Sequence, residues 1–164
     1  MRCRTRCAGF HPLAVVHDML SHSFDEDVVF DGVCDRILRM IGDLAATSGA
    51  VEAVRIGNFG EIRADAATSL AIVITELCQN AVEHGLERGE GRIEVRPEVL
   101  DEGMVIDVVD DGKGLPDGFR LGNQTSLGLA IISTLVGDLG DTLEIGNRED
   151  GHGTRARLVL PLLM

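Results

Sequence analysis

Residues 70–85 read LAIVITELCQNAVEHG, and this stretch decides the fold of the 164-residue chain. It predicts a helix with one buried face, because its apolar residues recur at helical spacing. These residues are Leu70, Val73, Ile74, Leu77 and Ala81. Asp65 is expected to cap the start of this helix, and Gly85 is a natural stop.

A second face of the same helix is polar. Glu76, Asn80 and Glu83 are spaced i, i+4 and i+7, so they project along one stripe, and His84 lies close to it. A polar stripe on an otherwise buried helix needs either solvent or a polar ligand. The helix alone leaves both interpretations open: an ordinary amphipathic helix with a wet face, or one wall of a binding site.

The flanking sequence predicts further elements. Asp31 is expected to cap an earlier helix whose apolar face holds Val33, Ile37, Leu38, Ile41 and Leu44. Strands are predicted at 51–62 (two short ones), 91–100, 104–109, 143–145 and 154–160, and a last helix at 126–136. This order predicts an α/β (α+β) two-layer sandwich, in which helices cover one face of a mixed, largely antiparallel sheet.

A glycine-containing loop, Asp110-Asp-Gly-Lys-Gly114, follows the apolar strand directly. A carboxylate at a strand end can accept a hydrogen bond from an exocyclic amine such as that of adenine. Gly112 and Gly114 would let the backbone pass close to a flat ring. Taken alone, the loop is equally consistent with a tight turn.

Two later motifs add phosphate-binding and turn features. Ser126-Leu-Gly-Leu129 precedes an apolar helical run, and the free amides of a helix N-terminus suit phosphate. Gly151-His-Gly-Thr154 leads into the final strand and, by itself, predicts only a hairpin turn.

In this order, the four motifs resemble those of the GHKL ATPase superfamily. Glu76-x-x-x-Asn80-Ala81 resembles its N box, Asp110-x-Gly112-x-Gly114 its G1 box, residues 126–131 its G2 region, and Gly151-x-Gly153-Thr154 the glycine-threonine motif before the last strand. Residues 125–132 are most similar to sensor histidine kinases, and residues 14–21 resemble the end of a dimerisation helix in the HisKA_2-type two-component subgroup. The resemblance implies a Bergerat fold, ATP and Mg²⁺.

The resemblance also implies roles for the matched residues. Asn80 would bind Mg²⁺ through its side-chain oxygen, Glu76 would polarise the attacking nucleophile, and Asp110 would accept a hydrogen bond from the adenine amine. The other cofactor-binding positions are His84, Gly112, Gly114, Leu127, Gly128, Leu129, Gly153 and Thr154. Residues 115–125 would form a short lid. Glu83 stands where many histidine kinases have a phosphate-facing Lys, so we expect cationic help from Mg²⁺, His84, Lys113 or Arg120.

The phosphoacceptor histidine of the resembled family sits in an H box early in the first dimerisation helix. None of His11, His17, His22, His84 and His152 has that context. We therefore expect residues 1–24 to be a tail with the remnant of a dimerisation helix, and residues 25–164 to be the ATP-binding catalytic domain. The expected function is transfer of the ATP γ-phosphoryl group to a histidine in cis or in trans, with a response regulator downstream.

Two alternatives remain open on the sequence: an anti-sigma-factor serine/threonine kinase, whose N box is similar, and a non-catalytic nucleotide-binding module. The net charge of -12 argues against a nucleic acid partner, since an acidic surface repels phosphate backbones. No apolar run approaches the roughly 18 residues of a membrane span, so we expect no direct membrane contact. We expect a cytoplasmic protein with reduced thiols.

Overall fold

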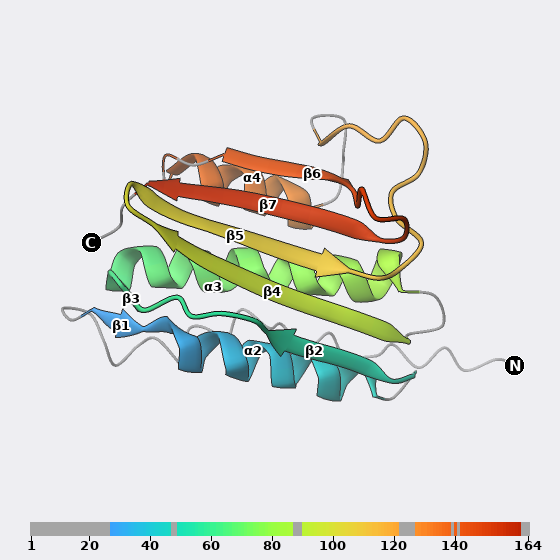
Figure 1. Cartoon of the computed structure of the whole chain (residues 1–164), viewed down its shortest axis with the longest axis horizontal. Helices are drawn as coiled ribbons and strands as arrows, with labels where there is room; N and C mark the ends of the chain where they lie inside the picture. Colours follow the sequence, from blue (N-terminus) through green and yellow to red (C-terminus); the bar gives the residue numbers. More distant parts are fainter. Residues whose placement is uncertain are drawn as a thin grey trace, which may run out of the picture.

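The computed structural model describes residues 27–46, 49–86, 90–121, 127–138, 140 and 142–161. Within them a five-stranded sheet has the order β2-β4-β5-β7-β6. Its strands are β2 (Val51–Arg55), β4 (Gly91–Leu100), β5 (Gly103–Asp110), β6 (Thr142–Asn147) and β7 (Thr154–Pro161). Only β2 and β4 pair in parallel, while every other neighbouring pair is antiparallel. The sheet is therefore mixed and largely antiparallel, as the sequence predicts (Figure 1).

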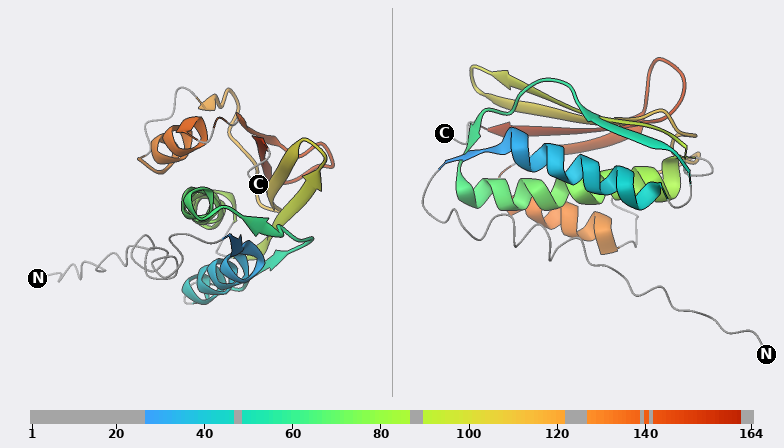
Figure 2. Two further views of the ribbon diagram at one scale, coloured as in Figure 1. Left: turned by 90° about the vertical axis from the view of Figure 1, so that its left-hand side faces the viewer. Right: turned by 90° about the horizontal axis from the view of Figure 1, so that it is seen from below.

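Helices cover one face of this sheet. They are α2 (Phe30–Ala45), α3 (Ala64–Asn80), the π-helical turn η1 (Ala81–Gly85) that continues α3, and α4 (Leu127–Asp138). In Figure 2, α3 lies between α2 and α4 on the same side of the sheet. A separate two-stranded sheet of β1 (Val28–Val29) and β3 (Glu61–Ile62) lies at the start of α2 and α3. The two-layer α/β sandwich is confirmed.

The core between the layers is aliphatic. Alternate strand residues such as Ile93, Val95, Ile106, Val108 and Leu158 are buried against α3, as the two-residue period of a strand requires. The free thiols of Cys34 and Cys78 are fully buried and act as small core groups. The outer face of the sheet instead carries arginine–carboxylate pairs, including Arg92–Glu52 at 2.6 Å and Arg157–Asp107 at 2.7 Å.

Three details of the predicted helices are wrong. Asp31 and Asp65 do not cap α2 and α3, whose N-cap residues are Val29 and Arg63 and make no side-chain cap hydrogen bond. Asp31 instead accepts a hydrogen bond from the Phe59 amide, because the close approach of the 56–60 loop supplies a donor. Leu44 is 50% exposed, since the buried face of α2 turns away from it in the last turn. In the described part of the chain, every helix is too short or too polar to cross a lipid bilayer.

Candidate nucleotide-binding site

A cavity of about 740 Å³ opens where the C-terminal end of α3 meets the ends of the central strands. Its helical wall is Leu77, Asn80, Ala81, His84 and Gly85, at positions i, i+3, i+4, i+7 and i+8. Its sheet wall is Val108, Asp110, Ile145, Thr154 and Ala156, and its outer rim is Lys113, Gly114, Leu115, Pro116 and Phe119. Leu129 contributes from α4. A cavity that is mostly apolar with a few polar groups is typical of a small-molecule site.

Asp110 is the buried carboxylate of this cavity, with a residue exposure of 5%. Its Oδ1 accepts hydrogen bonds from the main-chain amides of Gly112 at 2.9 Å and Thr154 at 3.2 Å. Burial raises the pKa of Asp110 above its usual value, and these two amides partly offset the rise. A carboxylate offers about four lone-pair sites, so Asp110 can still accept a hydrogen bond from a ligand.

The glycines around Asp110 are needed because other backbone passes too close for a side chain. A Cβ at Gly112 would lie 2.2 Å from the main-chain oxygen of Gly85, and one at Gly153 would lie 1.9 Å from the main-chain oxygen of Asp110. Gly112 and Gly153 therefore pack behind Asp110 and do not line the cavity themselves. Gly114 does line the cavity, and its φ of 78° favours glycine.

Glu76 and Gly128 meet where α3 faces the start of α4. A Cβ on Gly128 would lie 2.7 Å from Glu76 Oε2 and 4.0 Å from Asn80 Oδ1, so both side-chain oxygens approach the same part of α4. Burial raises the pKa of Glu76, and the nearby negative charge of Glu83 adds to the rise. Leu127 begins α4, but its side chain lies outside the described residues.

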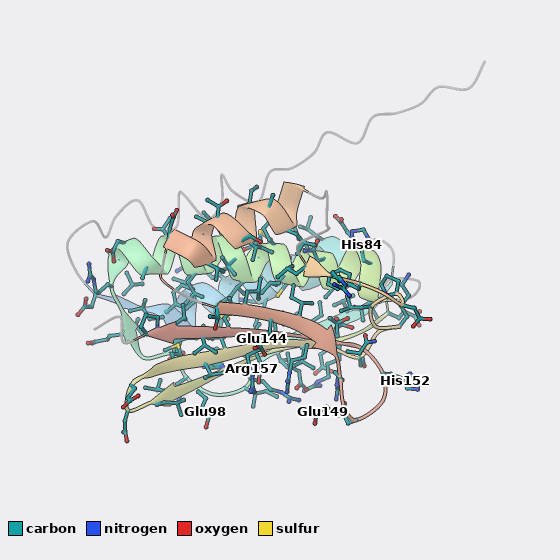
Figure 3. The ribbon with its side chains drawn as sticks, turned by 90° about the horizontal axis from the view of Figure 1, so that it is seen from above. His84, Glu98, Glu144, Glu149, His152 and Arg157 are labelled. Atoms are coloured by element: carbon teal, nitrogen blue, oxygen red, sulfur yellow. The ribbon has the colours of Figure 1, made fainter. Side chains whose placement is uncertain are left out.

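The polar stripe expected from the sequence is divided by the structure. Asn80 and His84 line the cavity, Glu76 lies against α4, and the side chain of Glu83 is 66% exposed beside His84. Part of the reason is the π-helical turn at Ala81–Gly85, where the amide of Leu86 bonds to the carbonyl of Ala81. A π-turn holds one residue more than an α-turn, so it shifts the side chains that follow. In Figure 3, His84 and the β6–β7 turn carrying His152 lie at the same end of the molecule.

Sequence reasoning missed several residues of this site. The apolar walls Val108, Ile145 and Ala156 could have been found from the alternation of their strands, since each shares a face with core residues. Phe119 falls within the lid expected at residues 115–125, but nothing in that loop without periodicity singled it out as a cavity residue; residues 122–125 lie outside the described residues. Asn147 and Arg148 looked like ordinary turn residues, but both contact the Asp110–Leu115 loop.

Comparison with known proteins agrees with this geometry. Residues 65–164 match the family described as "Histidine kinase-, DNA gyrase B-, and HSP90-like ATPase". The chain is 45% identical over 126 residues to the sensor histidine kinase PdtaS of Mycobacterium tuberculosis, an alignment that covers 76% of this chain and 25% of PdtaS. The chain thus spans about a quarter of the length of this relative.

Two solved structures share the fold. The histidine kinase domain of the blue-light activated histidine kinase EL346 from Erythrobacter litoralis aligns with a TM-score of 0.76 at 24% identity, covering 92% of this chain and 70% of that chain. Full-length ShkA in complex with AMPPNP aligns with a TM-score of 0.66 at 21% identity, covering 94% of this chain and 37% of that chain. The family match extends over more than half of the chain, and the cavity lies between the matched motifs. The chain belongs to the family of histidine kinase-, DNA gyrase B- and HSP90-like ATPases.

Proposed function

We propose that this chain binds Mg²⁺-ATP in the cavity and transfers the γ-phosphoryl group to a histidine on a dimerisation domain, in the same protein or another chain. The observation that carries this proposal is the buried carboxylate of Asp110 at the cavity wall. Main-chain amides hold its Oδ1, so its remaining lone pairs can accept the exocyclic amine of adenine. The AMPPNP in the complex of the similar protein ShkA supports a nucleotide as the ligand.

The apolar walls would hold the base of the nucleotide. Leu77 and Ala81 from the helices face Val108 and Ala156 from the sheet across the cavity. Thr154 supports Asp110 directly through its amide, and Gly112 and Gly153 let the backbone pack closely behind the carboxylate. Gly114 shapes the rim at the start of the loop.

The phosphate end would lie toward α4. Gly128 and Leu129 belong to the first turn of α4, which begins at Leu127, and the N-terminal end of a helix carries the partial positive charge that suits phosphate. His84 lines this cavity and Lys113 lies on its rim, so both are placed to offer hydrogen bonds or positive charge to phosphates.

The residues present fit Mg²⁺ bound together with phosphates. Asn80 offers an amide oxygen, which is the hard ligand that Mg²⁺ prefers, and Glu76 Oε2 lies near the same part of α4. Among the described residues, no group of three or more His, Cys, Asp or Glu side chains could hold a metal by itself. This is consistent with an ion that keeps several waters and takes its other ligands from phosphate. The bound ion would supply charge neutralisation at the transferring phosphoryl group.

Glu76 would orient the attacking nucleophile. Burial and the nearby negative charge of Glu83 raise its pKa, and its Oε2 faces the start of α4, where the phosphates would lie. Phosphoryl transfer depends mainly on positioning and charge stabilisation, which Glu76, Asn80 and the α4 amides would provide.

The partners in this proposal are a histidine-containing dimerisation domain and a downstream response regulator. The sensor histidine kinase PdtaS supports this assignment over the anti-sigma-factor kinase and the non-catalytic module. We also propose that residues 25–164 form the catalytic unit; residues 1–24, with the expected remnant of a dimerisation helix, lie outside the described residues. A cytoplasmic location is part of the proposal, because ATP and reduced thiols occur there.

Calorimetry with Mg²⁺-ADP tests the binding step, and Asp110→Asn is the decisive variant. Asparagine keeps an oxygen for the Gly112 and Thr154 amides but turns the other oxygen into a donor, so the adenine amine loses its acceptor. We expect at least roughly a hundredfold weaker binding, since a buried polar pair is mismatched. Asp101→Asn, in the exposed β4–β5 turn, is the matched control and should bind as the wild type does.

A phosphotransfer assay tests the second step. With radiolabelled Mg²⁺-ATP and a dimerisation domain from a sensor histidine kinase, we expect acid-labile label on the added domain, and none with Asn80→Ala. Nucleotide binding without label transfer would favour a non-catalytic module. No binding by the wild type would refute the whole proposal.

A further inference from the structure

The last residue of β6 and the turn that follows it, together residues 147–153 and called the β6–β7 turn below, contact both ends of the Asp110–Leu115 loop. At the loop's end, Asn147 Oδ1 accepts a hydrogen bond of 2.7 Å from the amide of Leu115. At its start, Arg148 Nη1 donates a hydrogen bond of 3.3 Å to the main-chain oxygen of Asp110. Two consecutive residues of the turn therefore hold the first and last residues of the loop.

The turn itself is well fixed. Asn147 pairs with Thr154 in the β6–β7 ladder, and the amide of Arg148 bonds to the carbonyl of Gly153 at 3.1 Å. The Arg148 guanidinium is also bound by Asp150, with 2.8 Å between Nε and Oδ1. Because the turn is tied to the sheet, it can act as a fixed support for the loop.

The other side of the loop is held by the last residue of η1. The amide of Lys113 donates to the carbonyl of Gly85 at 2.9 Å, and Gly112 donates to Asp110. Gly114 has a φ of 78°, and the residue after it, Leu115, donates its amide hydrogen bond to Asn147. This hydrogen bond fixes where the chain leaves the site. A Cβ on Gly114 would lie 2.7 Å from Asn147 Oδ1, so the backbone approaches this amide oxygen closely.

The residues that follow this contact form the rim of the cavity. Leu115, Pro116 and Phe119 all line it, and the amide of Phe119 bonds to the carbonyl of Pro116 to form a turn. The direction in which the chain leaves Leu115 therefore decides where these three side chains lie relative to the nucleotide.

We infer that Asn147 is a positioning residue of the nucleotide site: its side-chain oxygen fixes Leu115 and thereby sets the apolar rim against a bound adenine nucleotide. The inference rests on the proposed function for its ligand. The contact itself can be measured without any ligand.

The first experiment measures hydrogen exchange of the Leu115 amide without nucleotide. Asn147→Ala and Asn147→Lys both remove the acceptor, and lysine keeps an exposed polar side chain. Asn147→Asp keeps an oxygen acceptor, and Glu149→Ala changes an exposed residue of the same turn (Figure 3). We expect severalfold faster exchange in the Ala and Lys variants, and wild-type exchange in the Asp and Glu149→Ala variants.

The second experiment measures Mg²⁺-ADP binding by the same proteins. We expect a dissociation constant about three- to tenfold higher in Asn147→Ala and Asn147→Lys, as for the loss of one hydrogen bond, carried mainly by faster dissociation. Asn147→Asp should stay within about twofold of the wild type, since one acceptor is kept. The melting temperature of each variant is measured in parallel.

The outcomes separate the two proposals. If the wild type does not bind Mg²⁺-ADP, the proposed function fails, while the exchange of Leu115 still decides whether Asn147 holds the loop. If the wild type binds and the Ala and Lys variants match it in exchange and affinity, Asn147 has no positioning role. An equal loss of affinity in Asn147→Asp would also overturn the inference. So would losses of affinity that follow the melting temperatures of the three Asn147 variants.

Discussion

The Cβ position of Gly128 lies 2.7 Å from Oε2 of Glu76, so the start of α4 approaches α3 too closely for any side chain without moving this carboxylate. The contact joins a residue from the N-box motif to one from the G2 motif, which are 52 positions apart in the chain. It brings the expected catalytic carboxylate to the helix end that would meet the phosphates.

Gly128→Ala should fold but lose activity. The new methyl group meets the far end of a flexible side chain, so Glu76 can move aside and the helix gains propensity of up to about 1 kcal/mol. A displaced Glu76 no longer orients the nucleophile, and we expect phosphotransfer to fall about 10- to 100-fold. Single-turnover kinetics with the supplied dimerisation domain measure this.

Gly137→Ala is the matched control on the same helix. A Cβ there meets nothing within 4 Å, so this variant should gain the same helix propensity and keep full phosphotransfer. Equal rates in the two variants would show that the position of Glu76 does not matter.

Gly153→Ala should disrupt the nucleotide site and the fold together. Its φ of 101° is strained for alanine, and the added Cβ would lie 1.9 Å from the main-chain oxygen of Asp110. Backbone has to shift between β5 and β7, so we expect a loss of about 3 kcal/mol or more in the free energy of unfolding by urea denaturation.

Gly151→Ala separates the effect of backbone strain from that of the steric clash between a Cβ at position 153 and the main-chain oxygen of Asp110. Gly151 has a φ of 129° in the same turn, but nothing lies within 4 Å of its Cβ position. This variant should lose only about 1–3 kcal/mol from the strained conformation and should keep nucleotide binding. Similar losses in both variants would mean that the contact with Asp110 adds nothing.

Asp110→Asn should raise stability at neutral pH. Burial holds the pKa of Asp110 above the usual value of 3.8, so the folded state takes up a proton more readily than the unfolded state. The wild type is therefore destabilised as the pH rises through the raised pKa. Urea denaturation should show the variant more stable at pH 7, with the difference shrinking as the pH falls toward the usual value.

Asp150→Asn should show the opposite trend. The hydrogen bond from Arg148 lowers the pKa of Asp150, so its contribution is present above the usual value and is lost as the pH falls through the lowered pKa. If both variants had the same pH dependence, burial would not be the dominant effect at Asp110.

Arg55→Ala should destabilise the fold without touching the nucleotide site. Arg55 binds Asp35 through two hydrogen bonds of 2.9 and 3.1 Å, pairs with Asp31 at 3.2 Å and donates to Asn58 at 2.9 Å. Removing it takes one donor from each of these acceptors, although Asp31 keeps the Phe59 amide, and we expect a loss of about 1–2 kcal/mol. None of these residues lines the cavity, so calorimetry should give wild-type affinity for Mg²⁺-ADP.

Arg39→Ala is the control for Arg55. The exposed Arg39 donates one long hydrogen bond, of 3.3 Å, to the main-chain oxygen of Asp35, so its loss should change stability by less than about 0.5 kcal/mol. A comparable loss of stability in both variants would show that the contacts of Arg55 with Asp31, Asp35 and Asn58 stabilise the fold no more than one exposed hydrogen bond does.

The sequence by itself determined the layers of this protein. Helical spacing in residues 70–81 and two-residue alternation in strands such as 104–109 are local consequences of backbone geometry, and both predictions hold in the structure. The motif glycines Gly112 and Gly153 were singled out by the sequence as nucleotide-binding positions, but in the structure each is needed where another stretch of backbone passes close to it. The predicted helix caps Asp31 and Asp65 were wrong, because α2 and α3 each begin one residue before them. Asp31 binds the Phe59 amide instead, which comes from another segment.

Only the tertiary structure decided which polar residues share the site. Glu76, Asn80 and Glu83 follow one stripe in sequence, yet Glu76 and Asn80 approach Gly128 of α4 while the side chain of Glu83 is exposed beside His84. Asn147 comes next to the loop at Leu115 through strand pairing, 32 residues away in the chain. Periodicity reports the face of one element, whereas contacts between elements depend on how the layers pack, and no local pattern contains that information.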